Sequence, residues 1–213
     1  MFFDGIPLFA GLSATDHGLL LQVALRKTYP RNTLVVREGD PGNRFFLLRK
    51  GQAKVYLGND EGREVILAIL GPGDFFGEMA LVDDEPCSAN VMPLVDSEFV
   101  SIGKTEFQQV MASSPDMATN LLKALAQRLR EANQQIESLA LEDVQARVEH
   151  ALHGLARLED SELVVPASIT HRDIAAMVGA SREMVTRVFR NLEASGAIRV
   201  DGRRITLTPT ACT

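Results

Sequence analysis

A segment near the C-terminus carries side chains suited to hydrogen bonding with base edges. Arg182, Glu183 and Arg187 follow a helix-capping Ser181, and Thr186 and Arg190 share their face. The apolar residues of the segment recur at i, i+3, i+4 and i+7, as on the buried face of a helix: Val185, Val188, Phe189 and Leu192. In the DNA major groove, arginine can donate two bonds to guanine and glutamate can accept from cytosine. The alternative is a solvated face on which Glu183 and Arg187 form an i, i+4 ion pair.

The residues around this helix predict a winged helix-turn-helix. Thr170 and Asp173 have capping-box spacing, and Gly179 ends that first helix shortly before Ser181 begins the second. The segment "IRVDGRRITL" then reads as two alternating β runs joined at Asp201-Gly202, which predicts a hairpin. We expect Arg203 and Arg204 at its tip, where they could contact phosphates. The segment from 168 onward therefore predicts DNA binding.

Charge is distributed unevenly along the chain. The whole protein has a net charge of -6, but residues 168–213 hold seven arginines and four acidic residues, a balance of +3 that leaves -9 for the rest. A small basic segment in an acidic chain is where a polyanion is expected to bind.

A second segment of interest, "FFGEMALVDDEPCSANV" at residues 75–91, has a glycine turn but no basic residue. Two cysteines, Cys87 and Cys212, are too few for a disulfide scaffold, a structural zinc site or an iron-sulfur cluster. His150 and His153 share a helix face without a further ligand, so we expect no metal there. No signal peptide and no apolar run of about 18 residues appears, which predicts a cytoplasmic protein that does not contact a membrane.

The N-terminal half predicts a β domain. Short β runs between turn segments are typical of a sandwich or barrel: "TLVV" (33–36), "RFFLL" (44–48), "AKVYL" (53–57), "EVILAIL" (64–70) and "EFVSI" (98–102). Residues 8–25 have helical apolar spacing with Ser13 as a cap, which predicts a short helix packed on this β domain.

A long helix follows from Met117. Its apolar residues alternate in steps of three and four, as in a heptad seam: Leu122, Leu125, Leu129, Ala132, Ile136 and Leu139. Such a seam pairs best with the same helix of a second chain, which predicts a homodimer; the alternative is packing on the chain's own β domain. Residues 143–158 predict another helix, capped by Asp143, and 159–168 a loop. We therefore expect a β domain at 1–113, a dimerisation helix at 114–140 and a DNA-binding domain at 141–213.

The order of these motifs resembles the bacterial Crp/Fnr superfamily, through "GPGDFFGEMAL", the long helix, "LEDVQARV" and "ITHRDIAAMVGASREMVTRVFRNLEASGAI". The resemblance implies an α+β protein with an N-terminal cyclic-nucleotide-binding-type β jelly roll, a long dimerisation helix and a C-terminal winged helix-turn-helix. It implies a homodimeric transcription regulator on palindromic double-stranded DNA with TGTGA-like half-sites. The implied DNA-binding set is Thr170, Arg172, Ser181, Arg182, Glu183, Thr186, Arg187 and Arg203. Contact with RNA polymerase is implied by the family only.

The resemblance also explains the acidic segment. Gly77, Glu78 and Ser88, with Met79 between them, match the family's phosphate-binding cassette, where Glu holds the ribose hydroxyl and an Arg-Ser pair holds the cyclic phosphate. Here the Arg position is Cys87. On the long helix Arg128 matches a nucleotide-contacting arginine, but the Thr-Ser pair that holds adenine reads Ala132-Asn133.

Three interpretations of the effector site remain open. The site binds another nucleotide such as cyclic di-GMP, with Arg128 or another basic side chain of the roll replacing the missing charge. It is vestigial, and DNA binding is constitutive. Or it binds cyclic AMP or a different effector, including a redox signal at Cys87. No cofactor is obligatory in any of them.

Two other classes of function are less consistent with the residues. An enzyme with Cys87 as its nucleophile lacks a nearby histidine and a nucleophile motif, so we expect no catalysis. A nucleotide-binding regulatory subunit acting on a protein partner would leave the basic C-terminal segment unexplained.

Overall fold

The computed structural model describes residue 3 and residues 5–208. The chain divides into two compact units, Met1–Leu57 with Ala68–Ala132, and Gly58–Leu67 with Asn133–Thr213. The first unit holds most of the predicted β domain, and the second holds the predicted DNA-binding segment. None of the helices in the described ranges is long and apolar enough to span a membrane.

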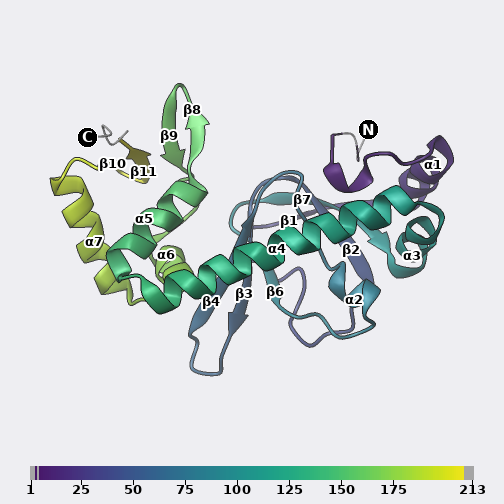
Figure 1. Ribbon diagram of the computed structural model, residues 1–213, viewed down its shortest axis with the longest axis horizontal. Coiled ribbons are helices and arrows are strands. Elements are labelled where there is room, and N and C mark those ends of the chain that lie inside the picture. The colour runs from purple at the N-terminus through teal and green to yellow at the C-terminus, as the bar shows by residue number, and fades with distance from the viewer. Residues whose placement is uncertain (1–2, 4, 209–213) are drawn as a thin grey trace. The chain divides into compact units, whose positions relative to one another are not determined.

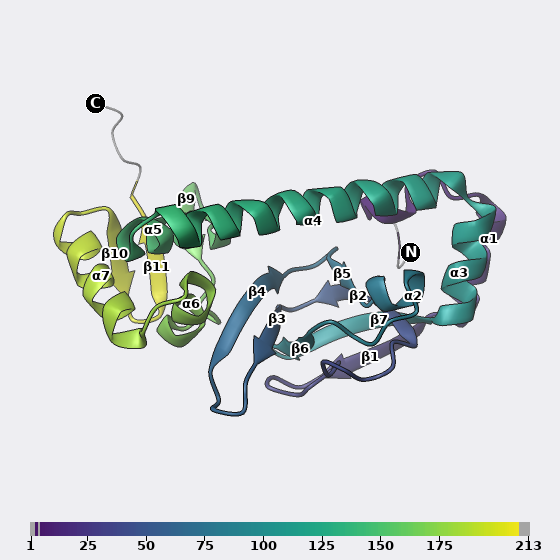
Figure 2. The same ribbon diagram turned by 60° about the horizontal axis from the view of Figure 1, so that its bottom comes forward.

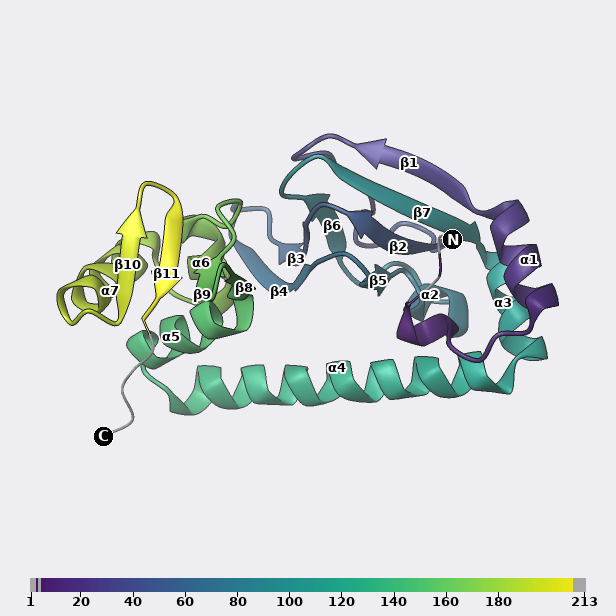
Figure 3. The same cartoon turned by 90° about the horizontal axis from the view of Figure 1, so that it is seen from above.

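Short strands build the β domain, as the sequence predicts (Figures 2 and 3). One sheet has the antiparallel order β1 (Leu25–Tyr29), β7 (Ser97–Gly103), β2 (Arg44–Lys50), β5 (Phe75–Phe76). A three-stranded sheet has the order β4 (Glu64–Leu70), β3 (Ala53–Gly58), β6 (Asn90–Pro93).

Alternation along β2 separates two apolar clusters. Phe45 and Leu47 lie in one cluster, whereas Phe46 and Leu48 lie in the other, because successive side chains of a strand point to opposite faces. The first cluster is covered by η1 (Pro7–Phe9), α1 (Ala14–Val23) and α3 (Lys104–Ser113). There the ring of Phe45 stacks on that of Phe107, with centroids 4.9 Å apart.

One prediction near the N-terminus is confirmed and one is wrong. The short helix predicted within residues 8–25 is α1, which buries Leu20 in the first cluster, and Leu25 begins β1. The predicted strand at 33–36 is reduced to an isolated bridge between Val36 and Val91. The cap is confirmed, since the Ser13 hydroxyl accepts a hydrogen bond from the Asp16 backbone N–H at 3.1 Å.

The predicted long helix is α4 (Pro115–Leu141), visible as one continuous helix in Figure 1. Its first turns bury Met117 and Leu121, and Leu125 packs against the first cluster. Further along the seam, Leu122, Leu129 and Ile136 are 68%, 64% and 64% exposed. Most of the predicted dimerisation face is therefore open to solvent in the single chain.

The described residues of the second unit form three further helices and an antiparallel sheet. The helices are α5 (Val144–Leu155), α6 (His171–Val178) and α7 (Arg182–Ala194). The sheet has the order β10 (Ile198–Asp201), β11 (Arg204–Leu207), β9 (Glu162–Val165), β8 (Arg157–Glu159). As predicted, the Asp143 carboxylate caps α5 by accepting from the Ala146 N–H at 2.9 Å.

Three predictions in this unit need correction. The helix expected at 143–158 ends at Leu155, and the segment expected to be a loop at 159–168 contains β9. The hairpin turn lies one residue later than expected, because Asp201 pairs with Arg204 and the two loop residues are Gly202 and Arg203. Arg203 is thus at the tip, but Arg204 belongs to β11.

Candidate nucleic-acid interface and effector site

Local hydrogen bonds fix the two helices of the helix-turn-helix. The capping box forms in full: the Thr170 N–H donates to Asp173 at 2.9 Å, and the Asp173 N–H donates to the Thr170 hydroxyl at 3.2 Å. Gly179 takes the left-handed conformation, with φ 61°, that ends α6. The Ser181 hydroxyl then caps α7 by accepting from the Met184 N–H at 3.2 Å.

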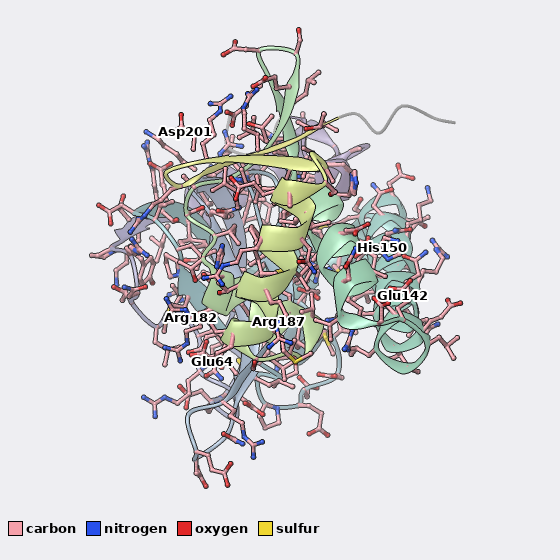
Figure 4. The ribbon with its side chains drawn as sticks, turned by 90° about the vertical axis from the view of Figure 1, so that its left-hand side faces the viewer. Glu64, Glu142, His150, Arg182, Arg187 and Asp201 are labelled. Carbon is pink, nitrogen blue, oxygen red and sulfur yellow. The ribbon has the colours of Figure 1, made fainter. Side chains whose placement is uncertain are left out.

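Helix α7 presents a buried apolar face and an exposed polar face (Figure 4). Arg182, Glu183, Arg187 and Arg190 are exposed, and with the half-buried Thr186 they line a concavity of about 410 Å³. Within the described ranges no ion pair joins Glu183 to Arg187. The sequence-predicted readers lie together on the exposed face of α7.

Glu183 remains a carboxylate at the beginning of α7. Its own backbone N–H, the Ser181 hydroxyl and the charge of Arg182 hold its pKa below the usual value. An ionised carboxylate only accepts hydrogen bonds, as contact with a cytosine amino group requires.

A second concavity, of about 360 Å³, lies between the two helices and the hairpin. Its lining includes Thr170 and Arg172 of the first helix, Arg182 of the second and Arg203 of the hairpin tip. Three guanidinium groups from three separate elements make this surface suitable for phosphate oxygens. Arg204 lies elsewhere, 3.6 Å from Glu159 and 3.7 Å from Glu162.

His171 is a residue of this interface that sequence reasoning missed. Its ring lies 4.3 Å from that of Phe189, and its Nδ1 is 3.4 Å from the Thr186 hydroxyl. That hydroxyl donates to the Arg182 carbonyl at 2.9 Å, so His171 connects α6 to the polar face of α7. Burial and the charge of Arg182 lower the pKa of His171. No local pattern indicates a contact between residues 15 positions apart.

In the β domain, the predicted cassette surrounds α2 (Met79–Val82). Gly77 has φ 84°, and a Cβ there would lie 2.5 Å from the Arg44 carbonyl oxygen, so the turn requires glycine. Glu78 is 2% exposed and forms an ion pair with Arg128 of α4, with Oε1 and Nη1 2.6 Å apart. Arg128 also donates to the Phe75 carbonyl and lies 4.6 Å from the centroid of its ring.

The other oxygen of Glu78 is buried without a hydrogen-bond partner. A buried acceptor without a hydrogen bond destabilises the fold, and a ligand could supply the missing donor. The carboxylate thus holds Arg128 on one side and offers a free acceptor on the other.

The remaining predicted effector residues are Met79, Cys87, Ser88 and Asn133. The exposed Ser88 hydroxyl contacts the sulfur of Met79 at 3.9 Å. Cys87 is half-buried, and burial and the Asp40 carboxylate raise the pKa of its thiol, which favours the neutral form. Asn133 is exposed on α4 and falls in the second compact unit.

Comparison with known proteins matches both halves of the chain to a family. Residues 26–114 match the cyclic nucleotide-binding domain, and residues 146–210 match the Crp-like helix-turn-helix domain. The cyclic AMP receptor protein of Thermus thermophilus is 35% identical over 196 residues, covering 92% of this chain and 89% of that protein. The chain belongs to the Crp/Fnr family of transcription regulators.

Other Crp/Fnr proteins agree with this assignment. A CRP-like cAMP-activated global transcriptional regulator of Mycobacterium tuberculosis is 31% identical over 202 residues, 93% of this chain and 90% of that one. A solved structure of CLP, the c-di-GMP responsive global regulator of Xanthomonas campestris, has a TM-score of 0.78 at 26% identity and covers 93% of this chain and all of that one. The predicted family and fold class are confirmed: this Crp/Fnr protein is a DNA-binding transcription regulator with a cyclic nucleotide-binding domain.

Proposed function

We propose that this regulator acts as a homodimer on palindromic DNA with TGTGA-like half-sites, under the control of a nucleotide bound in its β domain. The observation that carries the DNA part is the exposed set Arg182, Glu183 and Arg187 on a helix whose N-terminus is capped and whose opposite face is buried. The arginines supply donors for guanine, and the glutamate supplies an acceptor for cytosine.

Phosphate contacts position this helix in the groove. Thr170, Ser181, Arg172 and Arg203 surround the reading residues, and we assign them to the DNA backbone. Because such contacts release counterions, DNA affinity falls steeply with salt.

The homodimer is supported by the open apolar seam of α4. Leu122, Leu129 and Ile136 repeat at seven-residue intervals on a polar helix, and their exposure would be costly without a partner. A two-fold axis along α4 would present two α7 helices to successive turns of one DNA face.

The effector is proposed to be cyclic di-GMP or cyclic AMP, the ligands named for the relatives above. With Cys87 in place of arginine, one charge-assisted bond to the phosphate is absent, worth about 1.5 to 3 kcal/mol or roughly 10- to 150-fold in affinity. Cyclic AMP is therefore expected to bind weakly unless another basic group compensates.

A second proposal keeps the DNA activity without an effector. Glu78, which would hold a ribose hydroxyl, is 2% exposed and already pairs through one oxygen with Arg128, which is consistent with a vestigial pocket and constitutive DNA binding. A regulatory subunit acting on a protein partner would need no basic α7, and RNA polymerase contact rests on the family alone. DNA binding also implies a cytoplasmic location.

Fluorescence anisotropy of a labelled palindromic duplex at fixed salt tests these proposals, with no ligand, cyclic AMP, cyclic GMP and cyclic di-GMP in parallel. Effector control predicts that one nucleotide shifts the DNA affinity by about tenfold or more. Equal DNA affinity in every sample supports the constitutive alternative.

Arg187→Gln should lose about 1 to 3 kcal/mol of preference for the half-site, whereas Arg130→Gln on the exposed face of α4 should not. A fragment from Leu141 onward that retains DNA binding would support the proposed boundary at 140/141.

A further inference from the structure

A small cavity of about 180 Å³ lies beside the predicted phosphate-binding cassette. It is formed by the segment from Val35 to Phe46 together with Gly77 and Cys87. Drug-sized ligands fill pockets of about 300 to 1,000 Å³, so this cavity suits one chemical group of a ligand and not a whole nucleotide.

Backbone contacts hold the loop of this cavity against the cassette. The Gly39 N–H donates to the Cys87 carbonyl at 2.8 Å, and the Cys87 N–H donates to the Asp40 carbonyl at 2.9 Å. Gly42 is packed so closely that a Cβ there would lie 2.1 Å from the Cβ of Ala80. The cavity is therefore a built feature of the roll, with position 87 fixed on one wall.

Two arginines line the cavity, whereas Cys87 supplies no positive charge. Arg37 forms no ion pair or side-chain hydrogen bond in the described part of the chain, and Arg44 donates only to the Ser101 hydroxyl, at 3.4 Å. Asp40 also lines the cavity, so the three charged side chains leave one net positive charge. Guanidinium groups free of a carboxylate partner are strong donors to phosphate oxygens.

We propose that Arg37 and Arg44 form the phosphate subsite of this domain, in place of the arginine absent at position 87. The inference rests on the proposed effector function and specifies its ligand: a phosphodiester or cyclic phosphate bound at Arg37 and Arg44. Gly77 borders the cavity and precedes Glu78, whose buried free oxygen lies in the same turn and can accept a sugar hydroxyl. The ligand class is thus a nucleotide with a free hydroxyl next to its phosphate.

Isothermal titration calorimetry on the full-length protein tests the subsite, with cyclic di-GMP, cyclic AMP and uncharged adenosine as probes at fixed salt. Arg37→Gln and Arg44→Gln should each weaken the nucleotide that binds the wild type by about tenfold, and the double variant by more. The double Arg→Lys variant keeps the charge and should lose less. Asp40→Asn should tighten binding, because it removes the negative charge from the cavity.

Arg63→Gln is the matched control. Arg63 is an exposed arginine of the β domain that pairs with Glu61 and does not line the cavity, so its loss should leave nucleotide affinity unchanged. Both cavity arginines are exposed, and unchanged circular dichroism of their variants will show that the fold persists.

The outcomes separate this inference from the function on which it rests. Full nucleotide affinity in the double Gln variant overturns the subsite and leaves effector control intact. If no nucleotide binds the wild type, both effector control and the subsite are wrong, whereas the DNA activity is decided separately by anisotropy. An equal loss of adenosine binding in the Gln variants would show that the arginines act on the fold of the pocket and not on a phosphate, and would also overturn the inference.

Discussion

At the scale of single residues, His171 shows how the reading face of α7 is supported from behind. Its imidazole packs on Phe189 in the core and reaches the Thr186 hydroxyl, which in turn donates to the carbonyl of Arg182. A side chain that is not itself among the predicted readers therefore contacts Thr186, which shares their face. Its neutral form is favoured because burial and the neighbouring Arg182 both disfavour the imidazolium.

This environment predicts a pH dependence of stability. The pKa of His171 in the folded state lies below the unfolded value of about 6.5, so its contribution is complete above about pH 6.5 and is lost as pH falls through the lower folded value. Between about pH 7.5 and pH 5 the wild type should lose more unfolding free energy than His171→Gln, which has no imidazole at this position. Urea unfolding at both pH values measures this. An equal loss in both proteins would mean that His171 is not held neutral by the fold.

Position 87 predicts a gain of function. Cys87→Arg restores the basic group of the family cassette on the wall of a cavity that borders Gly77. We expect cyclic AMP to bind roughly 10- to 150-fold more tightly, the value of one charge-assisted bond. Calorimetry measures the cyclic AMP affinity of Cys87→Arg, of the wild type and of Cys87→Ser, which adds no charge. Unchanged affinity in Cys87→Arg would show that this position does not face the phosphate.

At the scale of elements, the helix ends were predictable because their signals are local. Thr170, Ser181 and Asp143 each cap the helix that the sequence assigns to them, and Gly179 ends α6. β1 was missed because it is exposed along most of its length and lacks alternation, so it is defined by its pairing with β7, 68 to 76 residues away. The contact of Arg128 with Glu78 spans 50 residues and likewise has no local signal.

The cap of α5 provides a test at this scale. Asp143→Ala removes the carboxylate that accepts the capping bond from the Ala146 N–H. The substitution should cost about 0.5 to 2 kcal/mol of unfolding free energy. Asp143→Asn keeps an oxygen acceptor and should cost much less. Chemical denaturation compares the two variants. Equal stability of Asp143→Ala and the wild type would show that the cap does not limit the stability of the second unit.

At the scale of the whole molecule, the open seam of α4 predicts the assembly. Leu129→Glu and Ile136→Glu place carboxylates at the centre of the proposed helix pair. Because both chains carry the substitutions, like charges would face each other across the two-fold axis. The double variant should therefore be a monomer with at least tenfold weaker binding to a two-half-site duplex. Lys123→Glu, an exposed position outside the seam, is the control. Analytical ultracentrifugation determines the mass. A double variant that remains dimeric would place the interface elsewhere.

The most direct test of a dimeric, sequence-reading regulator is the spacing of its half-sites. Anisotropy would compare a duplex whose two TGTGA-type half-sites are about 10 base pairs apart, centre to centre, with one in which about 5 base pairs are inserted between them. Two α7 helices related by a two-fold axis reach both half-sites only when these lie on the same face of the DNA, so we predict at least tenfold tighter binding to the first duplex. Equal affinity for the two duplexes would contradict the account.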